Sequence, residues 1–249
     1  MNSATGTLTI ALIITSISCT QNEYGEKVIA QHLIFDSTKI IGVAFKKENS
    51  NECKKIYLGE KGICLPELKG MIECYNEPEI KTRVDQFKVK GNTIHGYYMN
   101  DSLYKIAKEN TDYIVISDCY KVFSVNETHN ISITPTQLKE LFAETAKIYR
   151  KNIYNEALDE FDKKYKFITL DSPVVIEEYQ PHNNIQTALM LIRSNVMGKE
   201  SFSLMTLNLI IIKERLLFYS YYLMYNGNSS INFAKNKSDY YGLKIINEN

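Results

Sequence analysis

The stretch FSLMTLNLIIIKERLLFYSYYLMY, residues 202–225, decides the fold of this 249-residue chain. Leu204–Ile212 is apolar at seven of nine positions without strict alternation, and Leu216–Tyr225 has much the same composition. Such residues favour β-strands. We therefore expect two antiparallel strands, 202–213 and 216–225, joined by a turn at Glu214-Arg215. Strands that are apolar on both faces are covered on both faces, so a packed layer is predicted against each side of the sheet.

The neighbouring residues extend this pair into an antiparallel meander. Val174–Tyr179 and Ile185–Arg193 have strand composition, and Gly198-Lys199 is a turn signal. Asn226-Gly227-Asn228 ends the meander. A last helix is expected after it, capped by Ser229 or Ser230. Four residues at helical spacing form its apolar side: Ile231, Ala234, Tyr241 and Ile245.

A central helix is predicted at the segment Thr134-Pro135-Thr136-Gln137. Thr134 is the expected N-cap, Pro135 suits the first helical position, and Gln137 can reach back to complete a capping box. Apolar residues then repeat at intervals of three and four, which indicates one buried stripe. The stripe consists of Leu138, Leu141, Phe142, Thr145, Ile148 and Tyr149. The pattern continues weakly to Phe161, either as one long helix or as a second short helix after a break near Asn152–Asn155.

The first half of the chain contains shorter strand-like pieces separated by turn signals such as Lys90-Gly91-Asn92 and Asn100-Asp101. The expected strands are Val28–Phe35, Ile40–Lys46, Lys55–Leu58, Arg83–Val89, Thr93–Met99 and Tyr113–Ser117. Residues 59–82 are expected to be irregular, because they hold Gly62, Pro66, Gly70 and Pro78. The fold class is therefore α+β: an antiparallel sheet packed with a central helix near 135–150 and a C-terminal helix.

The N-terminus carries an uncharged, largely apolar run at residues 7–18, followed by Cys19. This run is too short to span a bilayer and has the length of a secretion-signal core. With small residues at Ser16 and Ser18, the segment resembles the signal of a bacterial lipoprotein. The resemblance implies a signal peptide at 1–18 and a diacylglycerol on Cys19, which would anchor the protein through a tether at 19–26.

Two features of this leader leave alternatives open. Ser16 stands where such signals usually carry Leu, Val or Ile, and no Lys or Arg precedes the apolar run. The alternatives are ordinary secretion with cleavage at the same bond, and a first β-strand of a cytosolic domain. In the leading interpretation, residues 27–249 form one α+β domain, with a subdivision near residue 130 left open.

Composition narrows the classes of partner. Lys plus Arg equals Asp plus Glu, at 29 each, and no basic stripe is interleaved with aromatics, so nucleic-acid binding is not expected. After Cys19, four cysteines remain: Cys53, Cys64, Cys74 and Cys119. In an exported chain they permit two disulfides in any of three pairings; the alternative is four small buried residues. Their spacing is not that of a zinc site.

Two weak resemblances concern the mature part. The segment Gly96–Asp101 and the tail Leu207–Asn249 resemble exported lipoproteins of Gram-negative bacteria that have no assigned activity. A meander followed by a terminal helix is also loosely similar to the PsbP/Mog1-like α/β/α fold. Likeness of fold does not decide function.

No segment forms a recognisable catalytic or metal-binding motif, so no metal and no cofactor are expected. The four histidines, His32, His95, His129 and His182, are scattered. His95 could pair with Asp101 and Ser102 in one hairpin, but a polar hairpin tip explains them better. Two acidic groups occur, Glu177-Glu178 and Asp159-Glu160 with Asp162. We expect their side chains to lie on solvent-exposed faces, since neighbours on a strand point to opposite sides. The 18 tyrosines are either an aromatic platform for a ligand or, preferably, half-buried residues of strands.

The function expected from these patterns is a lipid-anchored envelope protein on the periplasmic face or cell surface. It would be a non-enzymatic binding or interaction module, with the membrane and a protein as partners. Two alternatives remain open: an envelope hydrolase whose residues come from distant segments, and an immunity-type lipoprotein that neutralises a toxin.

Overall fold

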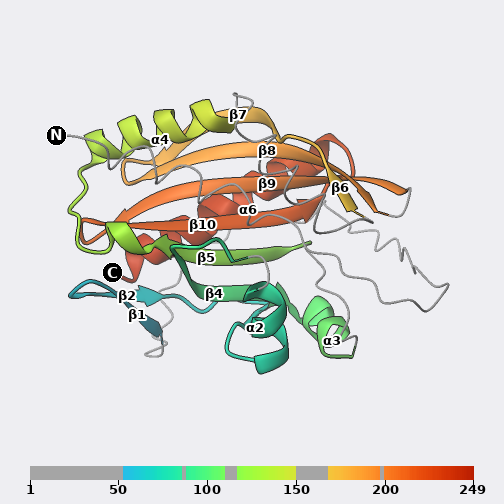
Figure 1. The fold of residues 1–249 in the computed structure, drawn as a ribbon, viewed down its shortest axis with the longest axis horizontal. Helices are drawn as coiled ribbons and strands as arrows, with labels where there is room; N and C mark the ends of the chain where they lie inside the picture. The colour runs from blue at the N-terminus through green and yellow to red at the C-terminus, as the bar shows by residue number, and fades with distance from the viewer. Residues whose placement is uncertain (1–52, 86–87, 110–116, 150–167, 197–198) are drawn as a thin grey trace.

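The computed structural model describes residues 53–85, 88–109, 117–149, 168–196 and 199–249. An antiparallel eight-stranded sheet forms its centre, in the order β3-β4-β5-β10-β9-β8, and β6 and β7 both pair with β8 at the far edge (Figure 1). The strands of this sheet are β3 (Met71–Glu73), β4 (Asn92–Asn100), β5 (Cys119–Val125), β6 (Ile168–Leu170), β7 (Val174–His182), β8 (Ile185–Val196), β9 (Lys199–Ile212) and β10 (Arg215–Met224). A separate hairpin pairs β1 (Lys54–Leu58) with β2 (Lys61–Leu65).

Helices and the hairpin supply the two covering layers. The helices are α2 (Pro78–Asp85), α3 (Asp101–Glu109), α4 (Pro135–Tyr149) and α6 (Asn228–Asn247), with a 3₁₀ turn η2 (Asn126–Thr128). The first core cluster joins one face of the sheet to α2, α3 and α4, and the second joins the opposite face to α6 and the β1–β2 hairpin. This arrangement confirms the predicted α+β fold class.

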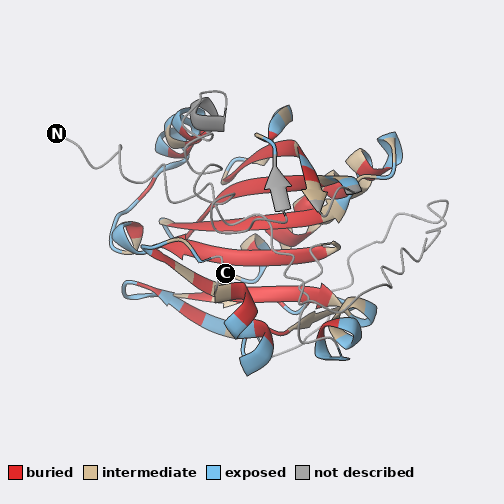
Figure 2. Cartoon of the chain, turned by 45° about the vertical axis from the view of Figure 1, so that its right-hand side comes forward, coloured by how far each residue is buried: buried red, intermediate tan, exposed pale blue. Residues whose placement is uncertain are grey.

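Alternation along β9 explains how one strand serves both layers. Leu207, Leu209 and Ile211 belong to the α4-side cluster, whereas Ile210 and Ile212 belong to the α6-side cluster. Side chains of a strand point to opposite faces in turn, so a continuous apolar run contributes to two cores. Buried residues accordingly follow the central strands, and exposed residues gather on the helices and loops (Figure 2).

The C-terminal meander and the central helix agree with the sequence. Strands β7 to β10 follow the predicted segments, and β10 pairs with β9 along its whole length. At the start of α4, Thr134 N donates to Gln137 Oε1 at 2.9 Å, and Gln137 N donates to Thr134 Oγ1 at 3.3 Å. The capping box is therefore present, and Leu138 and Phe142 are buried as expected.

Some local predictions were wrong. Arg83–Val89 is not a strand at its start, because Arg83 and Val84 lie in α2, where Pro78 takes a first helical position. Asn100-Asp101 is not a hairpin turn: Asn100 Oδ1 accepts a hydrogen bond from Leu103 N at 2.9 Å and caps α3.

The stretch 59–82, expected to be irregular, holds β2, β3 and part of α2. Strand β5 was not predicted, because Lys121 and Ser124 interrupt its apolar pattern. Strands 28–35 and 40–46, most of 113–117, and the second helical segment after 150 lie outside the described residues.

Two turn details also differ from expectation. The β9–β10 turn lies at Lys213-Glu214, both with positive φ (49° and 66°), one residue before the predicted position. Helix α6 begins after Gly227, and neither Ser229 nor Ser230 is its N-cap. Ser230 instead lies inside the first turn, where its Oγ accepts a hydrogen bond from Asn226 N at 2.9 Å.

Candidate functional site

Two histidines and one serine meet on the α6-side face of strands β4 and β5. His95 lies at a β-bulge, where the register of β4 against β5 shifts between Ile94 and Gly96. Ser124 is near the end of β5, and His129 directly follows η2. Bulges often re-aim a side chain beside a functional site. Here the bulge accompanies a His95 ring that is turned toward the neighbouring strand.

The hydroxyl of Ser124 is within hydrogen-bonding distance of both imidazoles. Ser124 Oγ lies 2.7 Å from His95 Nε2 and 2.7 Å from His129 Nε2, and the two ring centroids are 6.3 Å apart. A hydroxyl has one proton to donate and can also accept. If both contacts are hydrogen bonds between neutral groups, one imidazole accepts the serine proton and the other donates its own Nε2–H to the oxygen.

Burial keeps both imidazoles neutral. It lowers the pKa of His95 to about 4, and the charge of Lys54, or a proton on His129, acts in the same direction. Burial also lowers the pKa of His129 from its ordinary value. Ser124 itself is fully buried. At neutral pH the site therefore holds a buried hydroxyl beside two uncharged bases, which is an arrangement able to move a proton.

The β1–β2 hairpin lies next to this cluster. A Cβ atom on Gly59, in the hairpin turn, would lie 2.3 Å from Asn130 Oδ1 and 2.9 Å from the His129 carbonyl oxygen. A Cβ atom on Gly96, beside His95, would lie 3.6 Å from Leu65 Cδ1 of β2. The hairpin therefore contacts the chain on both sides of the histidine–serine cluster.

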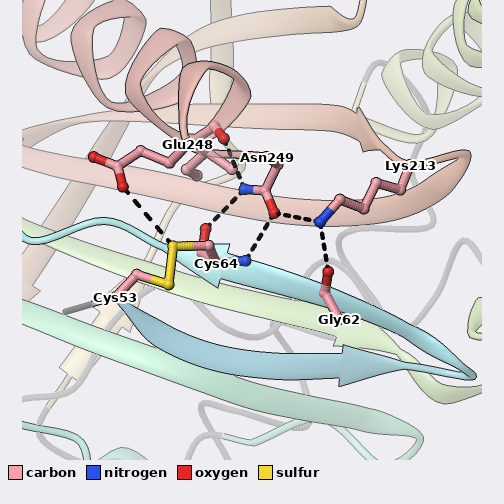
Figure 3. The surroundings of a disulfide bond; sticks show 7 residues. Cys53, Gly62, Cys64, Lys213, Glu248 and Asn249 are labelled. Atoms are coloured by element: carbon pink, nitrogen blue, oxygen red, sulfur yellow. Dashed lines mark hydrogen bonds between the residues drawn. A yellow bond between two sulfur atoms is a disulfide. The ribbon is translucent and has the colours of Figure 1, made fainter. Parts of the chain in front are cut away.

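A disulfide joins the two strands of this hairpin, and the side chains of Asn249 and Lys213 contact its second strand (Figure 3). Cys53 and Cys64 are joined across the two strands. The side chain of Asn249 accepts a hydrogen bond from Cys64 N at 2.8 Å and donates one to Cys64 O at 2.9 Å. Lys213 Nζ donates to Gly62 O at 2.8 Å. The hairpin is thus attached to the end of α6 and to the β9–β10 turn.

The other two cysteines are free thiols inside the α4-side core. The hydroxyl of Tyr97 donates to Cys119 Sγ at 3.4 Å, and Cys74 Sγ donates to the Tyr97 carbonyl oxygen at 3.2 Å. Burial raises the pKa of each thiol to about 12. Because the thiolate is the reactive form, both are inert structural residues.

The remaining candidate residues are dispersed. Asp101 and Ser102 are not the partners of His95, since His95 contacts Ser124 and Asp101 pairs with Lys105. His182 Nδ1 accepts a hydrogen bond from Asn184 N in the β7–β8 turn. Glu177 pairs with Lys235 of α6 at 2.7 Å. Cys19, His32, Asp159, Glu160 and Asp162 lie outside the described residues.

The tyrosine clusters are mainly core residues. Tyr98, Tyr120 and Tyr219 surround the ring of Tyr241, with centroids 4.8–5.6 Å from it. An exposed aromatic platform built from these residues is therefore ruled out. Among the described residues, seven tyrosines are at most 4% exposed: Tyr97, Tyr98, Tyr120, Tyr219, Tyr221, Tyr222 and Tyr241.

Sequence reasoning missed the role of Ser124 and the partnership of the two histidines. Ser124 and His129 are five residues apart, a separation that carries no signal by itself. His95 joins them only through the pairing of β4 with β5. Within the described residues, no group of three or more His, Cys, Asp or Glu side chains could hold a metal ion.

Comparisons with known proteins add no family. Neither the models of protein families nor the curated proteins include a match to this chain. In the described part of the chain, no helix combines the length and the apolar character needed to cross a membrane.

Proposed function

We propose that this chain is an exported, lipid-anchored envelope protein whose folded domain is a binding module. The apolar leader before Cys19 supports export and anchoring. The observation that carries the proposal is the Cys53–Cys64 disulfide. Disulfides persist in oxidising compartments outside the cytosol, so a structural disulfide agrees with a leader that directs export.

Exposed apolar side chains at one end of the sheet support the binding role. Val174 on β7 is 63% exposed and Phe202 on β9 is 38% exposed. The register places them near each other, because Val174 pairs with Leu191, and Leu191 pairs with Leu204, two residues after Phe202. These two side chains at the edge of the sheet are a candidate contact surface for a protein partner.

The anchor is tested by removing the sulfur that would carry it. Cys19→Ala should move the protein from the membrane fraction to the soluble fraction, because no diacylglycerol can then be attached. Cys74→Ala, which removes a buried free thiol, is the control and should stay in the membrane fraction. Intact mass of the native, detergent-extracted protein should give a chain that begins at an acylated Cys19. Recovery from the cytosol with Met1 still attached would contradict the proposal.

The binding role is tested by cross-linking in native membranes. Val174→Asp and Phe202→Asp should abolish a cross-linked partner that the unmodified protein retains. Tyr57→Asp is the matched control, since Tyr57 is 59% exposed on β1. A cross-linked toxin would identify the module as immunity-type. Equal cross-linking in all three variants would show that this end of the sheet is not the contact surface.

A further inference from the structure

We propose that Ser124 is the nucleophile of a serine–histidine acyl-transfer site, in which His129 accepts the hydroxyl proton and His95 positions the oxygen. This activity goes beyond the binding role and does not depend on it. The proposal rests on the geometry of one oxygen between two imidazole nitrogens, each at 2.7 Å. A nucleophilic serine needs a base at this distance, and a further group that orients the reacting atoms.

The roles of the two histidines follow from their surroundings. His95 lies within a strand pair beside the hairpin, and burial, followed by the nearby His129 and Lys54, disfavours a positive charge on its ring. His129 lies beyond the end of β5, and burial is the only cause that lowers its pKa. His129 is accordingly the better site for a transient imidazolium. His95 then remains neutral and donates its Nε2–H to Ser124 Oγ, which turns the hydroxyl proton toward His129.

The backbone holds these groups in place. Ser124 and His95 come from adjacent strands of the large sheet, and β4 and β5 are paired on both sides of the bulge. The His129 end is held by hydrogen bonds in η2, where Thr128 Oγ1 donates to Val125 O at 2.8 Å and His129 N donates to Asn126 O at 3.2 Å. Groups on rigid elements keep a reactive geometry better than groups on loops.

The reaction that fits is the hydrolysis of a small carboxylic ester. Ser124 Oγ forms a bond to the carbonyl carbon as its proton passes to His129 Nε2. The carbon–alkoxide bond then breaks, and the alkoxide leaves with the proton from His129. Water attacks the acyl-Ser124 ester next and gives a proton to His129. The Oγ–acyl bond breaks, the proton returns to Ser124 Oγ, and a carboxylic acid is released.

Access to Ser124 depends on the hairpin. Ser124 is fully buried, and the hairpin touches the chain on both sides of the cluster. An incoming ester therefore requires the hairpin to be displaced. The contacts of Cys64 with Asn249 and of Gly62 with Lys213 oppose that displacement, whereas the Cys53–Cys64 disulfide joins the two strands of the hairpin to each other. The reaction with Ser124 should be slow while the disulfide makes the whole hairpin move as one unit, and faster after it is reduced, because the two strands can then move apart.

The test uses diisopropyl fluorophosphate, which forms an Oγ–phosphorus bond as fluoride leaves and His129 takes the proton. The full chain is treated with the disulfide intact and with it reduced, and the adduct is located by peptide mass. We expect one adduct at Ser124, and a labelling rate reduced roughly 100-fold in His129→Asn, the order of loss for a missing general base. His182→Asn is the control and should label at the native rate.

Two results would contradict the proposal. Absence of an adduct at Ser124 in both disulfide states would overturn the proposal. Equal labelling rates in the native protein and in a folded His129→Asn variant would also overturn it, because the serine would then react without its base. Circular dichroism and thermal unfolding of each variant separate a loss of reactivity from a loss of fold. Neither test requires a Ser124→Ala variant, because peptide mass locates the adduct directly.

Discussion

At the scale of single residues, Ser124 and the two histidines around it place a buried hydroxyl beside two bases. A hydroxyl can donate one hydrogen bond and also accept, and Ser124 Oγ has two imidazole nitrogens at 2.7 Å. Lys121, also on β5, points to the opposite face of the sheet from Ser124. Burial there lowers its pKa to about 7. Strand β5 therefore places a buried polar side chain on each face of the sheet, Ser124 on one and Lys121 on the other.

The burial of His95 predicts a loss of stability in acid. Its folded-state pKa of about 4 lies below the ordinary value of 6.5, so the unfolded chain binds a proton that the folded chain does not in the window between them. The free energy of unfolding should therefore fall as the pH drops from 6.5 toward 4. The contribution of His95 to this fall is at most about 3 kcal/mol. Urea unfolding at pH 7, 5 and 4 measures the effect. His95→Asn should flatten this part of the profile, and His182→Asn should leave it intact. The same acid slope in His95→Asn would refute the assignment.

At the scale of elements, helix α6 is matched to the sheet by buried polar groups as well as by its apolar side. Thr206 Oγ1 of β9 donates to Ser238 Oγ at 2.9 Å, and Ser238 Oγ donates to Asn208 Oδ1 at 3.1 Å. These contacts explain why two polar residues, Thr206 and Asn208, interrupt the apolar run Leu204–Ile212. Tyr241 lies one turn further along α6 and packs among three sheet tyrosines, so the register of the helix on the sheet is closely defined.

Gly242 is the position where α6 approaches the sheet most tightly. A Cβ atom there would lie 2.1 Å from the Tyr219 hydroxyl and 2.8 Å from Ile185 Cδ1. Replacing glycine by alanine inside a helix normally stabilises it by about 1 kcal/mol. Gly242→Ala should instead lower the free energy of unfolding by about 2 kcal/mol through overpacking. The exposed control Asn236→Ala should be neutral or slightly stabilising. Chemical denaturation decides the sign, and a stabilised Gly242→Ala would contradict the close approach.

At the scale of the whole molecule, one sheet connects the two halves of the chain. Strand β5 pairs with β10, and the rings of Phe123 and Phe218 stack across that pair with centroids 5.3 Å apart. The β1–β2 hairpin is a smaller unit: the Cys53–Cys64 disulfide joins its two strands, and Asn249 attaches it to the end of α6. Its attachment is therefore more easily loosened than the central sheet.

Loss of the disulfide should act mainly on this hairpin. Replacing both Cys53 and Cys64 by Ser should cost about 2–3 kcal/mol for a loop of this size. Amide hydrogen exchange should rise in β1 and β2 while β9 and β10 stay protected, because the latter are paired on both sides. Cys74→Ser is the control. It replaces a free thiol outside the hairpin and should leave the hydrogen exchange of β1 and β2 unchanged. Uniform deprotection of the sheet would show that the hairpin is not a separate unit.

Short-range sequence patterns determine several elements of this protein without reference to any tertiary contact. The apolar content of residues 202–225 predicts β9 and β10, and the Thr134 capping box predicts the start of α4. The residues Ile231 to Ile245 predict α6 in the same way. These features depend on residues close together in the chain, and short-range propensity and periodicity are enough to describe them.

Only the tertiary structure decided the pairing of β5 with β10, the choice of Cys64 as the partner of Cys53, and the meeting of Ser124 with two histidines. The apolar pattern of β5 is interrupted by polar residues whose burial depends on neighbours elsewhere in the chain. Asn249 reaches Cys64 across a separation of 185 residues. Contacts of this kind depend on which strands lie side by side. A single sequence carries no local signal of the order of strands in the sheet.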